Sequence, residues 1–143
     1  MGWEWDDMKL LMFQAKRFRY RPFSKILEQA EDASEKEEVP EAAVIFVHAE
    51  AEDEQRRSKV LTKALKNIKW LANKRGLKNI VLHSFTHLAD SKASPEFAHG
   101  FLEEVAGRLR RTGYNVWLTP FGYVCEWELS VYGESLAKVF KEI

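Results

Sequence analysis

The sequence has only one cysteine, Cys125, and no excess of charge of either sign. A single cysteine excludes an intrachain disulfide and a cysteine-rich zinc site, which suits a reducing cytoplasm. The 22 basic and 22 acidic residues cancel, so net charge gives no argument for a nucleic-acid partner. Any nucleic-acid binding would need a local basic patch. No apolar run reaches the roughly 18 residues that a membrane-spanning helix requires.

Standard nucleotide-binding loops are missing too, because neither G-x-x-x-x-G-K-[ST] nor G-x-G-x-x-G occurs. The chain does have 45% hydrophobic and 13% aromatic residues over 143 positions, enough for one domain with a substantial core. Residues 1–7 are expected to form a short extension ahead of a domain over 8–143. With no internal repeat or linker, we predict a single α/β domain, a mixed β-sheet with flanking helices.

The pattern of apolar residues predicts the order of the elements. Buried strands are expected at the short apolar runs 9–15, 42–49 and 79–85, the first two as partners. Helices are expected, in chain order, at about 23–30, 54–75, 94–112 and 134–143. Two further strands flank the turn Pro120–Gly122, and such a short connection predicts an antiparallel hairpin of 114–119 with 123–132.

The stretch 16–21 alternates basic and aromatic residues. In a strand, its two kinds of side chain face opposite ways: Arg17, Arg19 and Arg21 on one face, Phe18 and Tyr20 on the other. A basic strand with interleaved aromatics can bind phosphates and stack bases, so these arginines are candidate RNA-binding residues. The same pattern also describes an ordinary half-buried strand with arginine on its solvated face.

Three residues could carry acid-base or nucleophilic chemistry. His83 and His87 lie in H-S-F-T-H, which lacks the glutamate of the zinc-protease motif. In a strand, four residues span roughly 13 Å, too far for one metal ion, so we expect no metal site. One histidine is then a hydrogen-bonded core residue, and His87 is either a surface residue or a group that binds or activates a substrate. Cys125 is either a small core residue or, beside a cation, a nucleophile.

Three motifs in this order resemble a known family: F-T-H-L-A at 85–89, R-R-T-G-Y-N-V at 110–116 and P-F-G-Y at 120–123. They resemble the archaeal N-terminal editing domain of threonyl-tRNA synthetase, and the likeness spans nearly the whole chain from Met8. The resemblance implies a D-aminoacyl-tRNA deacylase-like fold, a homodimer and no cofactor. It also implies hydrolysis of serine mischarged on threonine tRNA.

The resemblance also implies roles for individual residues. His87 corresponds to the active-site histidine of the family. The pocket for the aminoacyl-adenosine at the 3′ end of tRNA would be lined by Phe85, Thr86, Phe121 and Tyr123. These assignments follow from the matching motifs and not from spacing or periodicity.

The chain departs from the family at two positions. Cys125 stands where the family has a lysine, and Lys138, expected on the last helix, stands where the family has a glutamate. Either Lys138 supplies the missing cation from the other side of the site, or catalysis has been lost. With no room for the synthetase's own catalytic domain, we expect a free-standing relative. It would be a deacylase acting in trans, on serine or a D-amino acid, or an inactive module that binds tRNA or a synthetase chain.

Overall fold

The computed structural model describes residues 7–143, so the predicted extension 1–7 lies outside the described residues except for Asp7. Six strands and two long helices follow one another: β1 (Lys9–Lys25), β2 (Glu37–His48), α1 (Arg57–Asn73), β3 (Asn79–Ser84), α2 (Pro95–Arg111), β4 (Asn115–Leu118), β5 (Tyr123–Val131) and β6 (Lys138–Glu142). Short 3-10 helices occupy Ala51–Gln55 and Ser135–Ala137. In residues 7–143, no helix is long and apolar enough to cross a membrane.

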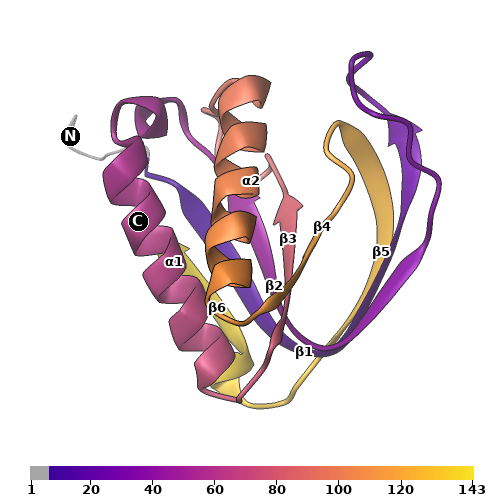
Figure 1. Ribbon diagram of the computed structural model, residues 1–143, viewed down its shortest axis with the longest axis vertical. Coiled ribbons are helices and arrows are strands. Elements are labelled where there is room, and N and C mark those ends of the chain that lie inside the picture. Colours follow the sequence, from indigo (N-terminus) through magenta and orange to yellow (C-terminus); the bar gives the residue numbers. More distant parts are fainter. Residues whose placement is uncertain (1–6) are drawn as a thin grey trace.

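The strands form one mixed sheet in the order β4-β3-β2-β1-β5, with β6 beside the first half of β1. β2, β3 and β4 run parallel and are connected through α1 and α2, whereas β1 is antiparallel to β2, β5 and β6. Both helices cover the same face of the sheet, and β5 curves away from them together with the second half of β1 (Figure 1). The predicted α/β domain with a mixed sheet is confirmed, as is the pairing of the first two strands.

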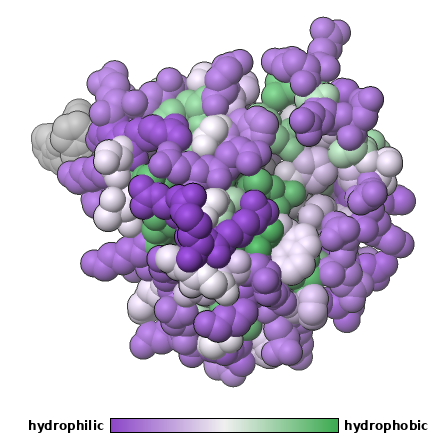
Figure 2. Space-filling view, viewed as in Figure 1, coloured by the Kyte–Doolittle hydropathy of each residue, from purple (hydrophilic) through white to green (hydrophobic). Residues whose placement is uncertain are grey.

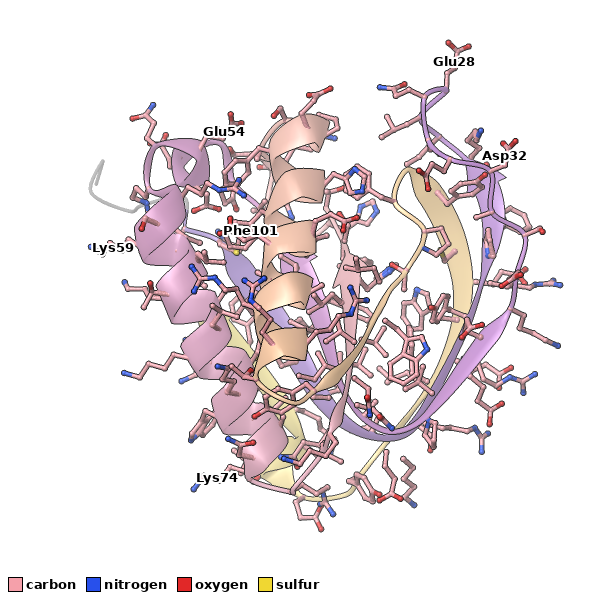
Figure 3. All side chains as sticks on the ribbon, in the orientation of Figure 1. Glu28, Asp32, Glu54, Lys59, Lys74 and Phe101 are labelled. Atoms are coloured by element: carbon pink, nitrogen blue, oxygen red, sulfur yellow. The ribbon has the colours of Figure 1, made fainter. Side chains whose placement is uncertain are left out.

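The main core lies between the helices and the sheet. α1 buries the apolar stripe that its sequence shows: Val60, Leu61, Ala64, Ile68, Leu71 and Ala72. Lys59 of α1 and Lys74, which follows the helix, point into solvent, while Phe101 of α2 turns toward α1 (Figure 3). α2 begins as predicted, with Ser94 Oγ accepting from the Phe97 N–H at 3.2 Å.

A second, smaller core covers the face of the sheet that the helices leave free. Phe46 of β2 lies at its centre, with five rings whose centroids are 4.9–6.4 Å away: Phe13, Phe18, His83, Phe85 and Trp127. We call these six residues the aromatic cluster. Aromatic rings bury a large area each, so this cluster stabilises the curved part of the sheet.

The predicted hairpin of β4 with β5 is wrong. β4 pairs with β3 in parallel at one end of the sheet order. β5 pairs with β1 at the opposite end. β4 is the last strand of a β-α-β-α-β unit and packs against α2, whereas Trp127 and Leu129 of β5 contribute to the second core. The short turn thus connects strands at opposite ends of the sheet order.

Two predicted helices are also wrong. At 23–30, β1 continues to Lys25, and Pro22 is tolerated because β2 pairing ends at Tyr20, which leaves only β5 as a neighbour. At 134–143 there is one 3-10 turn and then β6, because the first half of β1 offers a free edge that the chain end fills. In both places tertiary pairing overrides local helix propensity.

Candidate functional site

A cavity of about 270 Å³ opens where β3 ends, between the start of α2 and the start of β5. We call it the β3-end cavity; its lining is Ile26, Leu27, 83–87, Lys92, Ala93, Pro95, Ala98, 119–125 and Trp127. Six of the seven residues predicted for the pocket or its chemistry lie there: Phe85, Thr86, His87, Phe121, Tyr123 and Cys125. Hydrophilic residues dominate the face seen in Figure 2, and hydrophobic ones gather between α2 and the curved strands.

His87 lies at the exposed rim of the cavity, beyond the end of β3. Its ring meets that of Phe85 edge-on, with centroids 5.0 Å apart. Phe85 is in turn anchored, because its N–H donates to the Val47 carbonyl at 2.9 Å and its ring packs on Phe46. The rim position leaves the imidazole of His87 accessible to a ligand in the cavity.

His83 forms part of the cavity floor and is only 6% exposed. Its Nδ1 lies 2.8 Å from Oγ1 of Thr119, which confirms the expected hydrogen-bonded core histidine. Burial lowers the pKa of His83 to about 4, so the ring is neutral near pH 7. Among residues 7–143, no group of three or more His, Cys, Asp or Glu side chains is placed to hold a metal ion.

The turn before β5 forms one wall of the cavity. Gly122 has φ +84°, and a Cβ there would lie 2.7 Å from Cβ of Ala30, so only glycine fits. The Gly122 carbonyl accepts from the Ile26 N–H at 2.7 Å, which joins the turn to the end of β1. Phe121 stacks on His99 of α2 with centroids 4.6 Å apart, which fixes the other side of the turn.

Tyr123 and Cys125 enter the cavity from β5. The hydroxyl of Tyr123 accepts from the Ala33 N–H at 3.0 Å, so the ring is held in place. Burial raises the pKa of the Cys125 thiol, which keeps it protonated and makes it a poor nucleophile. These surroundings favour the core-residue interpretation of Cys125.

Lys138 does not line the β3-end cavity. It begins β6 opposite Phe13, and its Nζ donates to the carbonyls of Tyr132, Gly133 and Glu134 at 3.0–3.3 Å. The idea that Lys138 replaces the lost cation therefore lacks structural support. Of the lysines and arginines in the described chain, Lys92 alone lines the cavity. Sequence reasoning missed it because it lies in a loop without periodicity.

The alternation predicted for the basic strand is present, with Phe18 and Tyr20 buried. However, Arg19 lies 3.4 and 3.6 Å from carboxylates of the neighbouring strands, and Arg21 lies 2.6 Å from a third. These acids offset much of the positive charge of the strand. RNA binding by Arg17, Arg19 and Arg21 stays a prediction.

Comparison with known proteins identifies the family. The model of the archaea-specific editing domain of threonyl-tRNA synthetase matches residues 8–143. The chain belongs to this family. It is 31% identical over 139 residues to the threonine–tRNA ligase of Thermococcus sibiricus and 33% identical over 138 residues to that of Methanosphaera stadtmanae. Each match covers 95% of this chain but 22% of the relative, so the chain spans under a quarter of those ligases.

A solved structure shows the same fold. The protein titled c-Myc DNA Unwinding Element Binding Protein superposes with a TM-score of 0.69 at 14% sequence identity, over 94% of this chain and 98% of that one. At this identity the likeness carries the fold alone. The predicted D-aminoacyl-tRNA deacylase-like fold is confirmed.

Proposed function

We propose that this editing domain hydrolyses the ester that joins serine to mischarged threonine tRNA, acting in trans in the cytoplasm. One observation carries the proposal: a member of the editing-domain family gathers His87 and four residues implied for the pocket around a single cavity. The 3′ aminoacyl end of tRNA is the proposed ligand. A threonyl-tRNA synthetase chain is a proposed partner.

In the proposed reaction, water attacks the ester carbonyl carbon, and the bond from that carbon to the ribose oxygen breaks. The products are the free amino acid and tRNA with its terminal hydroxyl restored. His87 would orient the water or the substrate from the rim of the cavity. Backbone N–H groups at the end of β3 would stabilise the oxyanion, a role that needs no charged side chain.

Selection of serine over threonine would be steric. Threonine exceeds serine by one methyl group, and a pocket of fixed walls rejects an added methyl by clash more strongly than it favours a smaller group by attraction. The turn with Gly122 and the anchored Phe85 are such walls, because the Gly122 carbonyl accepts from the Ile26 and Leu27 N–H groups and the Phe85 N–H donates to the Val47 carbonyl.

The decisive experiment is a single-turnover deacylation assay with purified protein and tRNA charged with serine, threonine or a D-amino acid. We expect the seryl ester to be hydrolysed fastest, and His87→Ala to slow it by roughly a hundredfold, as for a group in acid-base catalysis. Lys59→Met on the outer face of α1 serves as the control. An unchanged rate in His87→Ala would leave this histidine without a catalytic role.

The second candidate function is an inactive accessory module that binds tRNA or a synthetase. The neutral thiol of Cys125 and the placement of Lys138 outside the cavity favour it, because both leave the reaction centre without the expected cation. Absence of hydrolysis for all three esters, together with retained tRNA binding in a filter assay, would support this function. Loss of hydrolysis in Lys138→Met would instead show that its amine reaches the substrate.

We further propose that the protein is a homodimer. Large apolar side chains are exposed on β1, on the loop after it and on β5: Phe23 (67%), Ile26 (62%), Val124 (49%) and Trp127 (40%). The last three line the cavity. A patch of this kind on a soluble protein marks an interaction surface. Light scattering is expected to give twice the 16.7 kDa chain mass, and Val124→Lys should shift it toward monomer. A monomer mass for the wild type at high concentration would contradict the dimer.

A further inference from the structure

We propose that His48 is a positioning residue that holds the loop Phe85–Ala93, and with it His87 and Lys92, in place at the cavity. We call this segment the site loop. His48 ends β2 and is fully buried. The part of the inference that concerns catalysis rests on the proposed deacylation, whereas the part that concerns loop geometry does not.

Both ring nitrogens of His48 are used by the site loop. The Leu88 N–H donates to Nδ1 at 3.3 Å, and Nε2 lies 2.6 Å from the carbonyl oxygen of Ser91. Since a backbone N–H only donates and a carbonyl only accepts, Nδ1 is the acceptor and Nε2 carries the proton. The ring is therefore one defined neutral tautomer. It binds the loop at Leu88 and at Ser91, on either side of Asp90.

His48 is the central attachment of the loop. The two ends are held by backbone bonds to β2 and its extension: the Phe85 N–H to the Val47 carbonyl at 2.9 Å and the Ala93 N–H to the Ala49 carbonyl at 2.8 Å. Between these anchors, every hydrogen bond found from the loop to the rest of the described chain goes to His48. The position of His87 therefore depends on the Phe85 anchor on one side and on the His48 bond at Leu88 on the other.

Charged groups lie close to the His48 ring. Glu50 Oε2 lies 3.4 Å from Nε2. The same oxygen accepts from Lys9 Nζ at 2.8 Å, so the buried ammonium offsets that charge. On the loop, Asp90 and Lys92 flank Ser91 in sequence with opposite charges.

The test separates the two bonds of His48 by amide substitution. In His48→Asn the side-chain oxygen takes the place of Nδ1 and retains an acceptor for Leu88, whereas in His48→Gln the side-chain nitrogen takes the place of Nε2 and retains a donor to Ser91. His48→Phe removes both bonds. The first readout is amide hydrogen exchange measured by NMR in the full chain without tRNA, with the Phe85 and Ala93 amides as internal references.

We expect Leu88 to lose its protection from exchange in His48→Phe and His48→Gln and to keep it in His48→Asn. Equal protection of Leu88 in the wild type and in His48→Gln would overturn the proposal. Should His48→Phe fail to fold, the Asn and Gln variants still decide the question.

The second readout is deacylation. We expect kcat to fall on the order of ten- to hundredfold in His48→Phe with a smaller change in KM, since misplacement of a reacting group slows chemistry more than binding. Undiminished kcat with a released Leu88 would overturn the positioning role. If no variant and no wild type hydrolyses any ester while Leu88 protection follows the expected pattern, the proposed function fails and the attachment by His48 stands.

Discussion

Acidification from about pH 6.5 to about pH 4 is expected to destabilise the folded protein by about 3 kcal/mol through His83 alone. Burial lowers the pKa of His83 from 6.5 to about 4 in the folded state. The unfolded chain keeps the higher pKa, so on acidification it binds a proton first and is favoured. The contribution is absent above about pH 6.5, grows as the pH falls and is complete below the folded pKa of about 4.

Urea unfolding of the wild type and of His83→Phe at several pH values between 7.5 and 4 isolates this effect. His83→Phe keeps an aromatic ring but cannot titrate, so its free energy of unfolding should fall less steeply on acidification. The lost bond to Thr119 adds an offset that does not depend on pH. A difference between the two proteins that stays constant over the whole range would contradict the buried, neutral His83.

The elements predicted correctly are those that local pattern defines. α1 and α2 follow from apolar residues at helical spacing, and α2 begins at a serine cap with proline in its first turn. β1 and β2 follow from short apolar runs. What the sequence did not predict was the partners of β4 and β5, because the two strands are joined by a short turn yet pair with different strands. The partner of a strand depends on which sheet edges and apolar faces the rest of the fold leaves exposed. A local sequence pattern contains no information about that.

The site divides in the same way. The residues next to His87 and in the turn before β5 were found because each carries a recognisable motif, and they do line one cavity. No motif predicts the other residues of the site. His48 lies at the end of β2, Thr119 follows β4, and Lys92 lies in an irregular loop. Lys138 was misplaced because its helix is in fact a strand. The error about Lys138 thus came from missing that β6 pairs with β1.

Phe46→Ala is expected to lower the free energy of unfolding by about 3–5 kcal/mol. Phe46 is 2% exposed and contacts five rings of the aromatic cluster, so truncation leaves a cavity that the surrounding strands cannot close. Phe140 of β6 provides a matched control, because it is also a strand phenylalanine but is 48% exposed. Its truncation should change stability by roughly 0.5 kcal/mol or less.

Phe46→Leu distinguishes loss of volume from loss of ring contacts. Leucine fills most of the space of the ring, so Phe46→Leu should retain a large part of the free energy of unfolding that Phe46→Ala loses. The floor and wall of the β3-end cavity would still move, because His83 and Phe85 rest on the Phe46 ring with centroids 4.9 and 5.1 Å away. Chemical denaturation measures the first effect, and NMR shifts of the His83 ring measure the second. If Phe46→Ala costs no more than Phe140→Ala, the aromatic cluster does not support the curved sheet, and the cavity walls must be held by the backbone bonds of the turn and loop alone.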